Sequence, residues 1–330
     1  METCVFLSHE LAEPMAGTAP TTRGWLLVEH PGPWAAKALT GSRGLDDGVG
    51  AELDERAARA GFRAALIRRP DETGRRIDEA AGPGGNESER AFDAPGRRAG
   101  DAGAAPDGPR TVFLAWTEPG GTWLRRLRVR TAADVLALDL AALAGPIEPA
   151  VGEATAEPLL LVCTNGKRDR CCAVAGRPLA GALAVSFPEA TWEVTHLGGH
   201  RFAPTALVLP QGYLYGRLDP TSARAVVAAA RRGEMLPDRC RGRATYSRAG
   251  QAAELAVRAD CGERLADVLS VYDERAEDDG GWTVRVDHRD GRTWTVAVDA
   301  RKEAPARPES CGKGEGLPTS MRARLLSHRQ

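Results

Sequence analysis

Aromatic residues and long apolar runs are scarce in this 330-residue chain. Phe, Trp and Tyr together make up 5% of it. The longest apolar stretches, GWLLVEH and PLLLVC, are far shorter than the roughly 20 residues that cross a bilayer. The net charge is −1, which gives no sign of a nucleic-acid or membrane-surface partner. The opening METCVFLSHELAEPM lacks the basic region and apolar core of a secretory signal, so we expect a cytoplasmic protein.

The cysteines are too few and too unevenly spread for a secreted disulfide framework. They are Cys4, Cys163, Cys171, Cys172, Cys240, Cys261 and Cys311. In a reducing compartment, a local group of cysteines indicates metal binding or catalysis rather than a disulfide. Only the three from 163 to 172 form such a group, and we interpret the other four as incidental.

One segment has almost no large apolar side chains. Residues 74–110 are rich in Gly, Ala, Pro and charged residues. Such a composition cannot bury enough apolar surface to offset the entropy of ordering the chain. We predict a disordered insertion here, which interrupts the first domain rather than separating two domains.

Outside the insertion, the chain shows a weak internal repeat. Each half predicts a strand, a helix, a second strand, a hairpin and a final helix, in the order of a thioredoxin-like sandwich. The segments are 24–30, 50–61, 63–69, 111–129 and 132–143 in the first half, and 158–162, 176–187, 190–197, 205–218 and 221–233 in the second. The first half also predicts a short helix at 35–39, after a Pro-rich turn. The predicted fold class is therefore α/β: a degenerate thioredoxin-like unit (1–150), a second unit that carries the chemistry (151–239), and a small α+β appendage (240–330).

The appendage has a different pattern. Segments 249–259 and 262–274 predict two amphipathic helices, and residues 281–300 alternate around an Asp-Gly turn, which is typical of a β-hairpin. Two helices and a hairpin also occur in winged-helix DNA-binding domains. The second helix would carry Glu263 and Asp267, however, and an acidic recognition helix argues against that function.

The stretch LLVCTNGKRDRCC contains three cysteines beside a loop of charged residues. Cys163 ends a buried-looking strand, Cys172 follows nine positions later at the start of a helix, and Cys171 precedes it directly. A helix N-terminus and a cationic loop both favour thiolate over thiol. Gly166 allows the loop to turn tightly and present backbone N–H groups to sulfur.

Two histidines complete the pattern. His196 and His200 are separated by Leu197 and two glycines, which predict a turn at the end of strand 190–197 rather than a helix. In a thioredoxin-like sheet this strand end lies near Cys163, so two Cys and two His converge at one edge.

Three kinds of site remain open on these residues. Structural zinc sites mostly use short Cys-x₂₋₄-Cys knuckles, which are absent here, although zinc accepts two Cys and two His. A thiol oxidoreductase would use Cys163 with Cys171 or Cys172, but it typically needs Cys-x-x-Cys. An iron–sulfur cluster suits four widely separated ligands.

The segments CTNGKRDRCCAVAGRPLA, THLGGHRFAPTALVLPQGYLYGRL and LSHELAEPMAGTAPTTRGWLLVEHPGPW resemble the sucrase/ferredoxin-like family. Its members are thioredoxin-like [2Fe–2S] ferredoxins. The resemblance implies Cys163, Cys172, His196 and His200 as cluster ligands, with Cys171 as a competing ligand. By analogy with thioredoxin-like folds, which often place a cis-proline facing the active loop, we also expect a cis peptide bond before Pro204.

The resemblance implies an electron-transfer or redox-sensing protein that exchanges electrons with a partner protein. With two thiolates and two neutral imidazoles, the oxidised cluster is neutral overall, so it is reduced more easily than one held by four thiolates. Such a protein is an electron carrier or a component of an oxidoreductase. No pair of carboxylates suggests a glycosidase. Gly166, Arg168, Asp169 and Arg201 are expected to support the ligands and to form a docking face.

Overall fold

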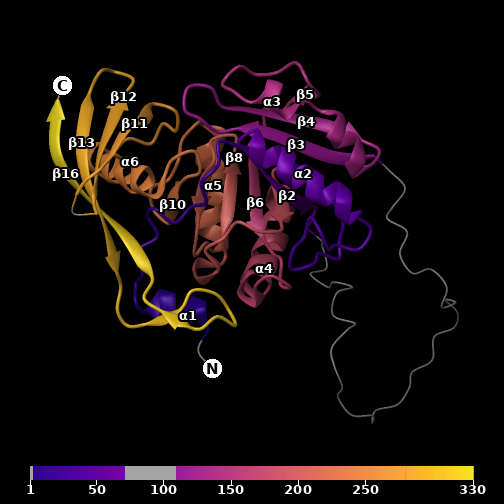
Figure 1. Cartoon of the computed structure of the whole chain (residues 1–330), viewed down its shortest axis with the longest axis horizontal. Helices are drawn as coiled ribbons and strands as arrows, with labels where there is room; N and C mark the ends of the chain where they lie inside the picture. Colours follow the sequence, from indigo (N-terminus) through magenta and orange to yellow (C-terminus); the bar gives the residue numbers. More distant parts are fainter. Residues whose placement is uncertain (1–2, 71–108, 279, 330) are drawn as a thin grey trace, which may run out of the picture.

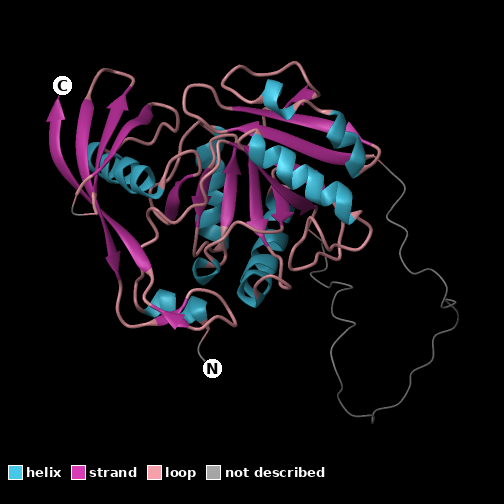
Figure 2. Ribbon diagram, in the orientation of Figure 1, coloured by secondary structure: helices cyan, strands magenta, loops and turns pink. Residues whose placement is uncertain are grey.

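The computed structural model describes residues 3–70, 109–278 and 280–329. It contains a large mixed sheet with flanking helices and a smaller C-terminal antiparallel sheet (Figure 1, Figure 2). The predicted α/β class is confirmed at this level. The insertion predicted at 74–110 lies outside the described residues, except for 109 and 110. Across the described ranges, no helix is long and apolar enough to cross a membrane.

Each half of the chain contributes five strands to the large sheet. The first half contains β1 (Gly24–Glu29), α2 (Asp47–Arg59), β2 (Phe62–Arg68), β3 (Arg110–Trp116), β4 (Trp123–Val129), η2 (Ala132–Ala137), α3 (Leu140–Leu143) and β5 (Glu153–Ala154). A short helix, α1 (Cys4–Glu10), precedes them. The helix predicted at 35–39 is wrong, because these residues form bends and a turn before α2. The second half contains β6 (Leu159–Cys163), α4 (Arg170–Ser186), β7 (Thr191–Val194), η3 (His200–Phe202), β8 (Ala206–Leu209), β9 (Tyr213–Tyr215), α5 (Pro220–Arg231) and β10 (Cys240–Arg243).

Strand pairing follows the same order in both halves. In the first half, β1 pairs in parallel with β2 and antiparallel with β3, which pairs antiparallel with β4. In the second half, β6 pairs in parallel with β7 and antiparallel with β8, which pairs antiparallel with β9. The halves join where β2 and β7 run antiparallel, with Arg68 opposite Glu193. These two side chains form a buried ion pair of 2.9 Å, so the junction is polar as well as hydrogen-bonded.

The two faces of this sheet have different neighbours. Along β6, Leu160 and Val162 face a core formed with α4 and α5. The alternate residues Leu159, Leu161 and Cys163 face a core to which strands of both halves contribute. Because side chains alternate along a strand, Cys163 lies on the shared side of the sheet.

The C-terminal part forms its own layer (Figure 1). It contains α6 (Arg248–Cys261), β11 (Leu269–Ala276), β12 (Trp282–His288), β13 (Thr293–Lys302), β14 (Arg307–Pro308), β15 (Glu315–Gly316) and β16 (Thr319–Arg329). The β-hairpin predicted at 281–300 is confirmed as β12 and β13. The helix predicted at 262–274 is wrong, because this segment ends in strand β11, which pairs with β12 along its whole length. Pairing with a neighbouring strand has overridden a weak helical periodicity.

The connection between β13 and β16 extends far from their sheet. Residues 303–318, here called the strap, descend to α1 at the base of the molecule and return (Figure 1). Within the strap, Arg307 donates to Glu13 across 3.1 Å, and the other oxygen of Glu13 accepts from Arg201 at 2.7 Å. All three side chains are almost fully buried. The strap is therefore anchored to both the N-terminal segment and the 200–203 turn.

Candidate metal centre

The loop between β6 and α4 is compact because its polar side chains bond to its own backbone. Asp169 is the N-cap of α4, and its Oδ1 accepts from the backbone N–H of Cys171 at 3.0 Å. Asn165 accepts from the backbone of Lys167 at 3.2 Å. Gly166 lies close to the helix, because a Cβ there would lie 2.7 Å from the Cβ of Ala173.

A second glycine, which the sequence analysis did not single out, brings α4 against the end of β6. A Cβ on Gly176 would lie 2.2 Å from the carbonyl oxygen of Cys163. This close approach places Cys172, in the first turn of α4, beside Cys163 at the strand end. Both cysteines are about 1% exposed, so the sulfurs are shielded from solvent.

The histidine turn has the predicted form. Strand β7 lies parallel to β6, with Val194 opposite Cys163, so the chain after β7 emerges beside this cysteine. Gly198 and Gly199 both adopt left-handed conformations, at φ 71° and 67°. The turn brings the rings of His196 and His200 to a centroid separation of 4.9 Å.

The four predicted ligands therefore come together from β6, α4 and the Gly-Gly turn. The Cys172 sulfur lies 3.2 Å from Nδ1 of His200. Asp169 extends the group, because its Oδ2 lies 4.0 Å from the same nitrogen. In the part of the chain that the structure describes, the ligand atoms of Asp169, Cys172 and His200 all lie within 4.8 Å of one another, and such a group is able to hold a metal ion.

The protonation states suit metal binding. Burial, with the neighbouring His200 and nearby arginines, lowers the pKa of His196 to about 3. Burial also lowers the pKa of His200, against the opposing effect of Asp169. Both imidazoles are therefore neutral at pH 7, which is the form that binds metals. Nδ1 of His196 is buried and has no hydrogen-bond partner among the described residues.

The contact between the two sulfurs shifts their pKa values in opposite directions. The hydrogen bond from Cys172 lowers the pKa of Cys163, and the backbone N–H groups of Asn165 and Leu197 act in the same direction. The same contact, with burial, raises the pKa of Cys172. Cys163 is thus the more readily ionised of the two; the Asn165 donor lies in the β6–α4 loop and the Leu197 donor in the histidine turn.

Two arginines that the sequence analysis missed hold the histidine turn. Arg63, on β2, donates to the His196 carbonyl at 3.4 Å, and Arg241, on β10, donates to the Gly198 carbonyl at 3.0 Å. Arg241 is fully buried. Both lie far from the turn in sequence, and no local pattern marks them. Their positive charges favour a negatively charged group at the ligands.

The two expected supporting arginines have different environments. Arg168 is exposed, and its charge lowers the pKa of both histidines, so it lies close to the ligands. Arg201 is instead buried in its ion pair with Glu13. The interpretation of Arg201 as part of a docking face is therefore wrong. The peptide bond between Ala203 and Pro204, beyond the turn, is cis as expected.

Cys171 turns away from this centre. Its sulfur lies 3.0 Å from that of Cys311 and 3.7 Å from that of Cys4. The interpretation of Cys4 and Cys311 as incidental is therefore wrong, because the chain fold brings them to Cys171. Cys240 and Cys261 belong to neither group of close ligand atoms in the described ranges.

The Gly-Gly turn offers a matched pair of substitutions. Gly198→Ala and Gly199→Ala each introduce a side chain at a left-handed residue, which costs about 1–2 kcal/mol. A Cβ on residue 199 would also lie 2.3 Å from Nη2 of Arg241, whereas a Cβ on residue 198 would meet nothing within 4 Å. We expect Gly199→Ala alone to displace His200 and to lower the metal content of the purified protein. Equal metal content in the two variants would show that the contact with Arg241 does not position His200.

A family model described as sucrase/ferredoxin-like matches residues 15–242. The match includes all four predicted ligands and both halves of the large sheet, and it ends before α6. Cys4 and Cys311 lie outside it. No curated protein and no solved structure matches the chain.

Proposed function

The chain belongs to the sucrase/ferredoxin-like family, and on that premise we propose that Cys163, Cys172, His196 and His200 hold a [2Fe–2S] cluster for electron transfer or redox sensing. One observation carries the proposal. Two buried cysteines in contact, the buried His200 and the partly buried His196 converge from three separate segments, and both imidazoles are neutral. Thiolates and imidazoles are the ligands that such clusters use.

The spacing of the donors supports an object larger than one ion. Asp169, Cys172 and His200 form the mutually close set at this position, and neither Cys163 nor His196 belongs to it in the described chain. A single tetrahedral zinc ion needs all its ligand atoms about 2.0–2.3 Å from one point. A two-iron core separates its two pairs of ligands, which suits the wider arrangement.

The surrounding residues would tune the electron affinity. A cluster with two cysteine and two histidine ligands would accept one electron and then carry a single negative charge. Arg63 and the fully buried Arg241 supply positive charge near that position. Backbone N–H groups directed at the Cys163 sulfur act similarly, because hydrogen bonds to sulfur stabilise the reduced state.

We also propose an acidic redox partner and a paired thioredoxin-like architecture. Lys167 and Arg168 are exposed on the loop between the two cysteine ligands, where they suit a negatively charged docking surface. The repeated strand pairing supports two thioredoxin-like units. The loop from β1 to α2 contains no cysteine, so the first unit would be structural.

The test is chemical analysis of protein purified without oxygen. We expect about two iron and two acid-labile sulfide per chain, visible absorption, and an electron paramagnetic resonance signal after reduction by dithionite. If the protein instead contains zinc and no sulfide, and this zinc is lost when Cys163 is replaced by serine, the proposal is overturned in favour of a structural zinc module. A metal-free protein whose redox activity is lost on alkylation would overturn it in favour of a thiol oxidoreductase.

A further inference from the structure

We propose that Cys4, Cys171 and Cys311 form a second metal site, which binds zinc and fastens the strap and α1 beside the first centre. The three residues come from α1, from the first turn of α4 and from the strap. Their sulfurs and a carboxylate oxygen of Asp169 all lie within 4.8 Å of one another. This inference does not depend on the identity of the group at Cys163 and Cys172.

The distances between the sulfurs fit a tetrahedral zinc site. Zinc–sulfur bonds of about 2.3 Å at tetrahedral angles place neighbouring sulfurs about 3.8 Å apart. The Cys4 sulfur lies 3.7 Å from that of Cys171 and 3.8 Å from that of Cys311. The remaining separation, between Cys171 and Cys311, is 3.0 Å. It is well beyond the roughly 2.05 Å of a disulfide bond, and opening it by less than 1 Å would complete the site.

The fourth donor is already positioned. Oδ2 of Asp169 accepts from the hydroxyl of Ser310 and from the backbone N–H of Cys311, both at 3.0 Å. These bonds hold the strap against the start of α4 and direct the carboxylate toward the sulfurs. Asp169 is 2% exposed, and a buried carboxylate next to two buried thiols and the partly buried Cys311 is stabilised by a cation.

Independent contacts bring the three segments together. The buried group of Arg201, Glu13 and Arg307 connects the strap to the N-terminal segment. Arg217 donates to the backbone carbonyls of Ser8 and Glu13, which fixes the end of α1. Cys4 and Cys171 are 2% and 7% exposed. The sulfurs therefore meet in a preformed, largely dry position, as structural zinc sites require.

A disulfide explains the geometry less well than a cation does. A bond between Cys171 and Cys311 would leave the buried Cys4 sulfur without a partner in the cluster and would place no positive charge beside the Asp169 carboxylate. A zinc ion uses all four groups and joins segments that are 167 and 140 residues apart in sequence. Since Asp169 also lies 4.0 Å from His200, the second site would stabilise the surroundings of the first.

The test is zinc analysis of the full-length protein and of single variants expressed with added zinc. We expect about one zinc per chain in the wild type, and near none in Cys4→Ser and Cys311→Ser. The matched control Cys261→Ser removes a partly exposed thiol outside the site and should keep its zinc. Cys163→Ser should also keep it. Zinc retained in Cys311→Ser, or lost in Cys163→Ser, would overturn the proposal.

Two further measurements on the wild type do not depend on the folding of a variant. Alkylation in denaturant without reductant, followed by mass spectrometry, should find Cys4, Cys171 and Cys311 all reduced. A Cys171–Cys311 disulfide in place of zinc would overturn the site. Removal of zinc by a chelator should increase protease cleavage within the strap, and added zinc should restore protection. Cleavage that is insensitive to zinc would equally contradict the proposal.

Discussion

Cys172→Ser is expected to abolish iron binding and visible absorption, whereas Cys171→Ser, one residue away, should leave both close to wild type. The reason is the direction of the two side chains in the first turn of α4. The Cys172 sulfur faces Nδ1 of His200 at 3.2 Å and contacts Cys163. The Cys171 sulfur faces Cys4 and Cys311 instead. Successive residues on a helix point about 100° apart, so neighbouring thiols serve different sites.

The two variants should also differ in their zinc content. Cys171→Ser is expected to lose zinc while it keeps iron, and Cys172→Ser to keep zinc while it loses iron. Iron, zinc and sulfide are measured on the same anaerobic preparations, together with circular dichroism to verify folding. Cys240→Ser is a suitable control, because this buried cysteine lies outside both groups of close ligand atoms in the described residues. Equal iron loss in both variants would contradict the assignment of Cys172 as the ligand.

The contacts that sequence could predict are the local ones. Cys163 and Cys172 are separated by one tight loop, and His196 and His200 by a glycine turn, so spacing and residue type constrain both pairs. The parallel pairing of β6 with β7 then brings the pairs together. For Gly166 the sequence predicts a tight turn; its close approach to Ala173 on α4 is a separate constraint that depends on the fold.

The contacts that sequence could not predict depend on distant segments. Arg241 reaches the histidine turn from β10, and Cys311 reaches Cys171 from a strap whose path is set by burial of Glu13 between two arginines. None of these positions has a periodic or spacing signal. Strand β11 was mistaken for a helix for a related reason, because its partner β12 lies later in the chain.

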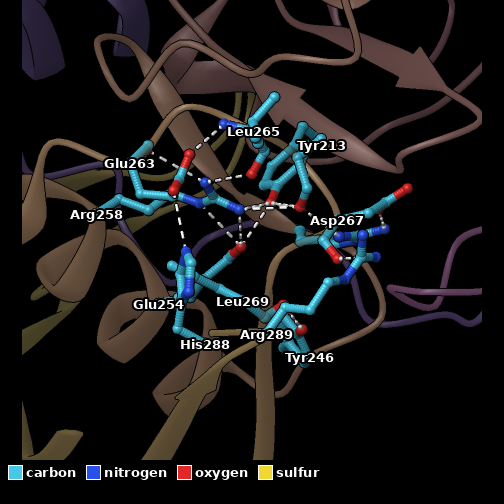
Figure 3. Close-up of polar contacts among 12 residues, drawn as sticks. Tyr213, Tyr246, Glu254, Arg258, Glu263, Leu265, Asp267, Leu269, His288 and Arg289 are labelled. Atoms are coloured by element: carbon cyan, nitrogen blue, oxygen red, sulfur yellow. Dashed lines mark hydrogen bonds and ion pairs between the residues drawn. The ribbon is translucent and has the colours of Figure 1, made fainter. Parts of the chain in front are cut away.

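Arg258→Met is expected to reduce the free energy of unfolding by roughly 3–5 kcal/mol, the cost of leaving a buried charge without its partner. Arg258 and Glu254 lie one turn apart on α6, 3.1 Å from each other, and both are fully buried. Arg258 also donates to Tyr213 on β9 and to the backbone carbonyls of Leu265 and Ala266 (Figure 3). The substitution would remove the positive charge beside Glu254, whose carboxylate would keep only the Tyr213 hydroxyl as donor, and it would remove the donor to the Leu265 carbonyl.

The size of this effect is measured by urea unfolding followed by circular dichroism. The double variant Arg258→Met/Glu254→Gln should recover part of the loss, because it removes the unpaired charge together with its partner. Arg231→Met removes an arginine from the half-exposed pair with Glu157 and should change stability by at most about 1 kcal/mol. A loss in Arg258→Met no greater than in this control would show that the buried network contributes no net stability.

The same substitution links the C-terminal sheet to the metal centres. Helix α6 packs on β11, β12, β13 and β16, and its contact with Tyr213 connects that layer to the large sheet (Figure 1, Figure 3). The strap begins and ends in this layer and carries Cys311. Loosening α6 should therefore weaken zinc retention before it affects iron, because the strap carries a ligand of the second site and none of the first. Zinc and iron release are measured together at increasing urea concentration. In Arg258→Met, zinc should be released at a lower urea concentration than iron, whereas in the wild type the two concentrations should be closer. Simultaneous release of both metals in both proteins would contradict this coupling.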